Sequence, residues 1–259
     1  MEDFLLFAAV GFAAQLVDGA LGMAYGVISS TVLLSLGVPP ATSSASVHAS
    51  KVFTGAASAL SHAGHRNIDV RTLVPLAGAG VLGGCVGVFV LTSIEGSRIK
   101  PYVIAWLAVM GLVILARAWR GVTPRSAPFK APAPLGFVGG VLDAMGGGGW
   151  GPTVTTTLVG SGMAPRQAIG TSNAAEFFVA VAVSSAFLFA LVTGRWENAE
   201  GLRDHAWAVG GLVVGGIVAA PLAGWITKVL PAAGPVWVVG ALVLGLALYQ
   251  GAQMMGLAG

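Results

Sequence analysis

The chain has 259 residues, of which 56% are hydrophobic and only 9% are charged, and its mean hydropathy is +0.85. Because soluble domains carry about 25% charged residues, this composition excludes a soluble globular protein. Long apolar runs recur from end to end, which predicts an all-α, polytopic membrane protein. The net charge of +3 comes from cations that mostly flank these runs, as topology signals do, so we expect the lipid bilayer and no nucleic acid as a partner.

The first predicted element, residues 3–36, is too long for one ordinary span. As a straight helix it would measure about 50 Å, against a hydrocarbon core of about 30 Å. An acid and several glycines also interrupt it between Asp18 and Gly26. We predict two short helices around a break, the second over Val27–Leu36, and the segment either spans the membrane or re-enters it as a hairpin.

Three ordinary spans are predicted next, over residues 41–63, 70–94 and 98–119. The polar stretch Arg117–Pro134 follows them. We assign residues 1–120 to a first transmembrane repeat, 121–134 to a polar cytoplasmic linker and 135–259 to a second transmembrane repeat.

The second half has the same order of elements. Residues 134–162 form a broken segment, interrupted between Asp143 and Gly151, with a short helix predicted over Pro152–Val159. Three spans follow, over residues 166–193, 204–228 and 234–256.

An internal repeat supports this division. Residues 11–53 align without gaps on residues 136–178, and eleven of the 43 positions are identical, including Asp18 with Asp143, Gly22 with Gly147 and Pro40 with Pro165. If the broken segments re-enter, the second repeat is inverted, and if they span, the repeats are parallel. The two acids near the N-terminus favour an outside N-terminus and therefore inverted repeats.

The breaks themselves have two interpretations. Irregular backbone at membrane depth survives only inside protein or beside water, and paired breaks with helix N-termini are typical of anion sites in transporters. We therefore propose that Gly147, Gly148 and Gly149 let a ligand approach the backbone, with Tyr25 and Trp150 as walls. Alternatively, the glycines serve close helix packing, and Asp18 and Asp143 cap the turns.

A polar stretch follows each break, and these stretches supply the other candidate residues. Ala41–Phe53 aligns with Arg166–Phe178, which places His48 opposite Asn173 and Lys51 opposite Glu176. Lys51 and Glu176 either neutralise each other, or Lys51 faces an anion while Glu176 or His48 takes up a proton. The predicted substrate-binding residues of these stretches are Ser43, Ser46, His48, Lys51, Thr171, Ser172 and Asn173.

The two related halves with acid–glycine breaks, the run GGGGWGP and the sequence RQAIGTSNAAEF resemble the sulfite exporter TauE/SafE family of membrane permeases. The first half departs from the pattern, because DGALGMAYG has fewer glycines and Ala45–Val47 replaces Gly170–Ser172. The resemblance implies transport of sulfite, sulfoacetate or similar sulfonates across the cell inner membrane.

We predict a secondary transporter that binds its anion at mid-membrane between the repeats, with proton coupling as an option. A passive anion channel and a membrane-embedded enzyme are the alternatives. We expect no catalytic residue, metal or cofactor, and a homo-oligomer stays open. The identity of the anion, the direction of transport and the coupling ion do not follow from the sequence.

Overall fold

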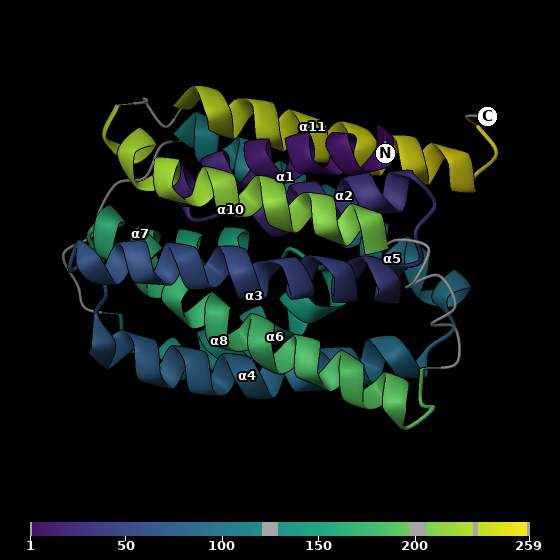
Figure 1. Ribbon diagram of the computed structural model, residues 1–259, viewed down its shortest axis with the longest axis horizontal. Helices are drawn as coiled ribbons and strands as arrows, with labels where there is room; N and C mark the ends of the chain where they lie inside the picture. Colours follow the sequence, from purple (N-terminus) through teal and green to yellow (C-terminus); the bar gives the residue numbers. More distant parts are fainter. Residues whose placement is uncertain (1, 121–128, 197–205, 230–232, 258–259) are drawn as a thin grey trace.

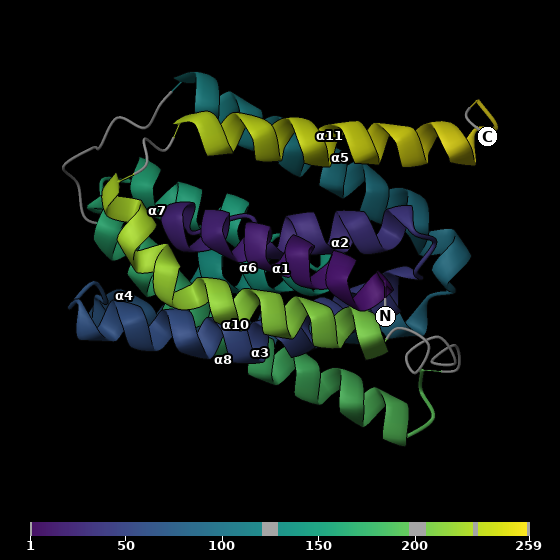
Figure 2. The same cartoon turned by 45° about the horizontal axis from the view of Figure 1, so that its top comes forward.

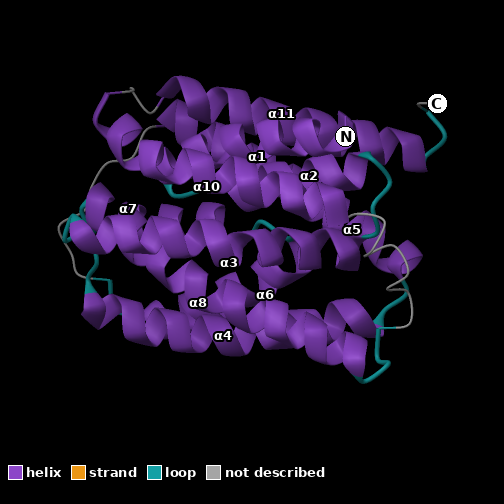
Figure 3. Cartoon of the chain, viewed as in Figure 1, coloured by secondary structure: helices purple, strands orange, loops and turns teal. Residues whose placement is uncertain are grey.

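The computed structural model describes residues 2–120, 129–196, 206–229 and 233–257 (Figure 1). Every regular element in these residues is a helix (Figure 3), as the composition predicts. In chain order they are α1 (Glu2–Leu21), α2 (Tyr25–Ser35), α3 (Pro40–Gly64), α4 (Val70–Ser93), α5 (Gly96–Arg120), α6 (Pro132–Gly146), the π-helix η1 (Gly151–Thr155), α7 (Thr156–Gly160), α8 (Pro165–Val192), α10 (Ala206–Val229) and α11 (Ala233–Met254).

Four helical stretches among the described residues are long and apolar enough to cross a bilayer: Val70–Ser93, Gly96–Trp119, Pro165–Val192 and Trp237–Met254. Two predicted spans are not among them: α10 contributes only the shorter apolar stretch Ala206–Pro221, and α3 carries many hydroxyls together with His48 and Lys51. Most of these polar side chains are buried by neighbouring helices, so α3 is shielded from lipid on its polar face.

The predicted breaks are present but begin four residues later than expected. Helix α1 continues through Asp18 to Leu21, and α6 continues through Asp143 to Gly146. Gly22 and Gly147 then adopt left-handed φ angles of 66° and 69°, which glycine tolerates without strain. Each glycine N–H donates to the carbonyl of the aspartate four residues earlier, so both aspartates belong to the last helical turn.

Further boundaries differ from the sequence predictions, and α2 begins at Tyr25 rather than at Val27. Helix α6 begins at Pro132, inside the predicted linker, because proline suits the first turn of a helix. The short helix predicted over Pro152–Val159 begins one residue earlier and is π-helical over its first five residues. The remainder of the predicted linker, residues 121–128, lies outside the described residues.

Equivalent helices of the two halves make equivalent contacts. Helix α1 lies along α10, and its counterpart α6 lies along α4, while α3 pairs with α8 and α5 with α11 (Figure 2). Glycines allow the helices of two of these pairs, α4 with α6 and α1 with α10, to approach closely. Gly140 faces the backbone of Gly80, and Gly215 faces the backbone of Ala8, with no room for a side chain. Such small-residue contacts are typical of membrane helix pairs.

Each broken segment starts and finishes at one end of the molecule. Phe4 in α1 packs on Trp207 at the start of α10, and Gly37 after α2 lines a cavity with Trp196, near the end of α8. At the opposite end, α7 leads into α8, whose Gly170 packs on Asn67. The geometry is that of the hairpin alternative (Figure 1), and the inverted topology across a bilayer stays a prediction.

Candidate functional site

A cluster of buried charges lies where α3 crosses α8, next to both breaks. The Nζ atom of Lys51 lies 2.7 Å from Oε1 of Glu176 and 3.0 Å from Oδ1 of Asp143. Nε2 of His48 lies 3.1 Å from the other oxygen of Asp143. The contact between Lys51 and Glu176, one of the two predicted alternatives, is therefore present. Asp143, which belongs to the same half of the chain as Glu176, also contacts Lys51.

The crossing of α3 and α8 explains why these residues meet. Lys51 and Glu176 are equivalent in the repeat alignment, so their contact joins corresponding positions of the two halves. Nδ2 of Asn173 donates to Oγ of Ser58 at 3.1 Å, and Asn173 lies one turn before Glu176 in α8, whereas Ser58 lies two turns after Lys51 in α3. The two helices therefore run antiparallel through the cluster.

The two aspartates cap the helices that follow the breaks. Oδ1 of Asp18 accepts a hydrogen bond from the backbone N–H of Tyr25 at 3.2 Å, and Oδ1 of Asp143 accepts one from Trp150 N–H at 3.1 Å. Both bonds span seven residues, so each carboxylate compensates the positive end of the next short helix. This agrees with the capping alternative, and for Asp143 it is combined with the two cations.

Ser44 and Asp143 fix the ring of His48. Nδ1 lies 2.8 Å from the carbonyl oxygen of Ser44 and 3.3 Å from its hydroxyl oxygen, and Nε2 lies 3.1 Å from the carboxylate of Asp143. His48 and Lys51 therefore both reach Asp143 from one face of α3.

A small cavity separates Asp18 from this cluster. It measures about 20 Å³, which is room for roughly one water molecule. The residues that line it are mostly of polar types and come from α1, α2, α3 and α8: Gln15, Asp18, Tyr25, Lys51, Thr54, Gly55, Ser58, Asn173 and Glu176. Asp18 is only 8% exposed, yet no cation among the described residues forms an ion pair with it.

The two breaks pack on each other rather than around an open space. A side chain at Gly26 would meet the backbone of Gly147 and Gly148, and one at Gly151 would meet Met23 and the carbonyl of Gly22. These two contacts are equivalent under the repeat. In this conformation the other break occupies the space next to Gly147, Gly148 and Gly149 that the predicted ligand would need. The glycines serve close packing here, which was the alternative interpretation.

The predicted aromatic walls have different surroundings. Trp150 is fully buried, and its indole N–H lies 3.1 Å from both the carbonyl and the hydroxyl oxygen of Ser172. It packs against Gly80 of α4 and does not line the cavity. Tyr25 does line the cavity, and its hydroxyl donates to the carbonyl of Leu212 at 3.0 Å.

The remaining predicted residues are spread around the cluster. Thr171 Oγ1 accepts a hydrogen bond from Asp69 N–H at 2.9 Å, which ties α8 to the α3–α4 loop. Ser43 donates to the carbonyl of Ser30 at 3.5 Å. Ser46 is buried, and its hydroxyl finds no hydrogen-bond partner in the described part of the chain.

The sequence prediction did not include five polar residues of the site. Gln15, Thr54 and Ser58 line the cavity, Ser44 holds His48, and Thr155 donates to the carbonyl of Gly22 at 2.7 Å. Helical spacing offers a signal for the first three, because Gln15 precedes Asp18 by three residues, and Thr54 and Ser58 follow Lys51 by three and seven. No described group of His, Cys, Asp and Glu side chains is arranged to hold a metal ion.

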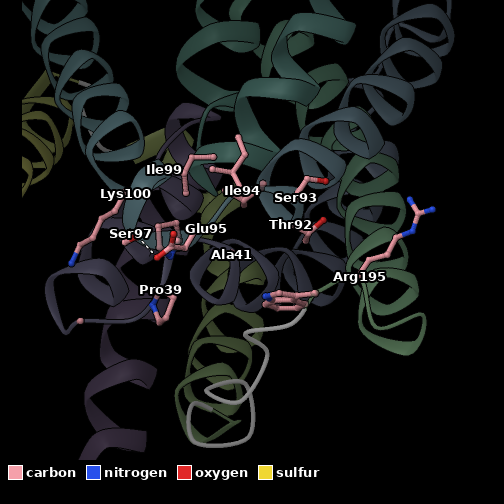
Figure 4. A pocket seen from close by; sticks show the side chains of 15 residues that line it. Pro39, Ala41, Thr92, Ser93, Ile94, Glu95, Ser97, Ile99, Lys100 and Arg195 are labelled. Atoms are coloured by element: carbon pink, nitrogen blue, oxygen red, sulfur yellow. Dashed lines mark hydrogen bonds between the residues drawn. The ribbon is translucent and has the colours of Figure 1, made fainter.

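Three cavities follow one another along α3. A cavity of about 580 Å³ lies at the end of the molecule that holds the α4–α5 loop, with Lys100 and Arg195 on opposite sides of the view in Figure 4. A second cavity, of about 310 Å³, is lined by Ala45, Ser46 and Ala49. Trp196 lines both, and the central cavity at Lys51 follows. At the opposite end, Asn67 and Asp69 pack on Gly170 and Thr171.

Comparison with known proteins gives a consistent result. A family model described as "Sulfite exporter TauE/SafE" matches residues 7–250. The chain is similar to "Probable membrane transporter protein YtnM" of Bacillus subtilis (strain 168), with 40% identity over 235 residues, which is 88% of this chain and 76% of that protein. No solved structure matches the chain.

Proposed function

The chain belongs to the sulfite exporter TauE/SafE family of membrane transporters, and from this premise we propose that it carries small sulfur-containing anions, such as sulfite or sulfoacetate. We place it in the cell inner membrane as a multi-pass secondary transporter. The observation that carries the anion assignment is Lys51, a lysine only 4% exposed at the contact between the two repeats. Charges inside membrane proteins are costly and usually face a transport path.

The surroundings of Lys51 suit a tetrahedral or trigonal oxyanion. The imidazole of His48 lies one turn away, and amides and hydroxyls of Gln15, Thr54, Ser58, Asn173 and Tyr25 surround the cavity. In the present conformation Glu176 and Asp143 hold the Lys51 ammonium. A sulfonate or sulfite oxygen would replace the Glu176 carboxylate at Nζ, since both are oxyanions of similar charge.

The small size of the central cavity supports a carrier rather than a passive channel. At about 20 Å³ it does not hold a sulfonate, so the halves must move apart before an anion binds. The two larger cavities lie along α3 between the α4–α5 end of the molecule and the central cavity. At the opposite end, the α3–α4 loop packs on α8 and closes access to the central cavity. Opening one end while the other is closed is the requirement for alternating access.

Flux through purified protein tests this proposal. Proteoliposomes loaded with sulfite or sulfoacetate should exchange the anion with saturable kinetics, and the flux should respond to an imposed pH gradient. Lys51→Ala should reduce flux at least about tenfold, because hydrogen bonds to charged groups contribute roughly 1.5–3 kcal/mol. Arg98→Ala is the matched control, since Arg98 is an exposed cation paired with Glu95 at 3.3 Å.

The same vesicles separate the alternatives. A conductance far above carrier turnover would identify a channel, and a product chemically different from the added anion would identify an enzyme. An absence of flux for every sulfur anion, from protein shown to be folded, would refute the substrate assignment.

A further inference from the structure

The charges of the cluster do not balance without an additional proton. Three carboxyl groups, Asp18, Asp143 and Glu176, lie with one lysine, Lys51, and one histidine, His48. Even with a proton on His48, two cations neutralise only two carboxylates, and the third buried carboxylate would leave a net negative charge in a region of low dielectric. Such a charge is costly, and the usual result is that the group binds a proton.

The hydrogen bonds show which carboxyl group is committed to the cations. Asp143 faces both Lys51 and His48 and also accepts from Trp150 N–H. Each of these partners is a donor, so Asp143 is the carboxylate that stays ionised. The extra proton therefore belongs to Asp18 and Glu176, which line the two sides of the central cavity.

The internal repeat gives this pair a role in the transport cycle. Asp18 is equivalent to Asp143, Glu176 to Lys51, and Asn173 to His48. In the present conformation α3 packs on α6, and Lys51 and His48 of α3 hold Asp143. The equivalent contact between α8 and α1 is much weaker, and the cavity lies there instead.

If the halves exchange their arrangements during transport, α8 closes on α1 and Glu176 meets Asp18. Two carboxylates repel each other at hydrogen-bond distance, whereas one carboxylic acid and one carboxylate form a strong hydrogen bond. The contact between α3 and α6 pairs a lysine with an aspartate and needs no proton of its own. The equivalent contact between α8 and α1 pairs a glutamate with an aspartate, and this contact requires the additional proton.

We propose that Asp18 and Glu176 form a proton-binding pair, and that closure of the cavity around one shared proton releases Lys51 from Glu176 to receive the transported anion. The proton comes from water, adds to one carboxylate oxygen and leaves by the same bond. The proposal rests on the proposed function, and it names the proton as the coupling ion with one proton for each anion. The other ionisable groups around the pair are Lys51, Tyr25, and Asp143 with His48; the rest of the cavity lining does not titrate.

Infrared spectroscopy of the purified, anion-free protein tests the pair directly. We expect a C=O stretching band of a protonated carboxyl group that disappears as the pH is raised and the pair loses its proton. Glu176→Gln and Asp18→Asn should each abolish this band, because one proton is shared. Asn at position 18 keeps an oxygen for Tyr25 N–H, so the cap is retained. Asp69→Asn is the control, since Asp69 caps α4 away from the cluster and its substitution should leave the band intact.

Binding of sulfoacetate gives a second readout. In the wild-type protein its affinity should fall by about tenfold per pH unit where the pair loses its proton, because one linked proton has this slope. In Glu176→Gln the affinity should change by less than about twofold over the same range. Sulfoacetate keeps a constant charge above about pH 6, since carboxyl groups ionise near pH 4.

The two readouts separate the two proposals. If neither single variant removes the carboxyl band, or if Glu176→Gln keeps the wild-type pH slope, the proton pair is wrong. If the band behaves as expected but the wild-type protein binds and carries no sulfur anion, the pair stands and the substrate assignment fails.

Discussion

Replacement of the two repeat-related aspartates by alanine should have unequal effects on stability. Asp18 and Asp143 are equivalent, are both buried, and cap equivalent helices with hydrogen bonds of 3.2 and 3.1 Å. Only Asp143 also contacts Lys51 and His48, at 3.0 and 3.1 Å. The pair of variants therefore isolates the contribution of the ion pairs from that of the cap.

The expected magnitudes follow from these contacts. Asp18→Ala should lower the free energy of unfolding by about 1 kcal/mol, the usual contribution of a helix cap. Asp143→Ala also removes the buried partner of Lys51 and His48, and breaking a buried ion pair costs about 3–5 kcal/mol. We expect the second variant to be less stable than the first by about 3 kcal/mol or more.

Equilibrium unfolding in mixed micelles, with increasing sodium dodecyl sulfate, measures this difference in the full chain. Asp143→Asn, which keeps an oxygen for Trp150 N–H, should lie between the alanine variant and the wild-type protein. Equal losses for Asp18→Ala and Asp143→Ala would refute the assignment of Lys51 and His48 to Asp143.

Three further outcomes are expected. Gly148→Ala should prevent folding, because the added methyl group would overlap the backbone of α2, whereas Gly78→Ala, with open space around it, should be close to neutral by thermal denaturation. Trp150→Phe should lower the free energy of unfolding by about 1 kcal/mol, because the hydrogen bonds of the indole N–H to Ser172 are lost. An unchanged midpoint of unfolding in denaturant would show that these hydrogen bonds do not stabilise the protein. In a cysteine-free background, Ala49→Cys should react with a charged thiol reagent added at the α4–α5 end, because Ala49 lines a cavity on that side. Its repeat counterpart Ala174→Cys, at a position that is 3% exposed, should not react. Equal labelling of the two would exclude access to the site through the cavities along α3.

The spans were predictable because their length and hydropathy follow from the bilayer. The ends of α3, α4 and α8 lie within a residue or two of the expected positions, with prolines at the start of α3 and α8. The breaks were found from their glycines and the repeat. Their first residues were misplaced because Asp18 and Asp143 cap the next helix from inside the preceding one.

The partners within the site were less predictable. The repeat placed Lys51 opposite Glu176, because residues on the axis of a two-fold arrangement meet their own equivalents. The sequence did not indicate that Lys51 and His48 hold Asp143 rather than Asp18, since the two aspartates have the same local context. That choice depends on whether α3 lies closer to α6 or α8 to α1, which is a property of the tertiary packing.

The glycine run shows a second limit. Four consecutive glycines before Trp150 fit both a ligand site and a close backbone contact, and spacing alone does not separate these uses. The structure places the backbone of Gly26 and Val27 against Gly148, so the partner of the run is the other break. The partner lies more than a hundred residues away in the sequence.

The central claim is that the buried lysine at the contact between the repeats binds the transported anion. Calorimetric titration of the purified protein with sulfoacetate tests it most directly, with Lys51→Gln beside Arg98→Gln. Our account predicts saturable binding to the wild-type protein and to Arg98→Gln, and an affinity at least about tenfold weaker in Lys51→Gln. Equal affinity in all three proteins would contradict it, and would leave Lys51 as a structural partner of Asp143 and Glu176.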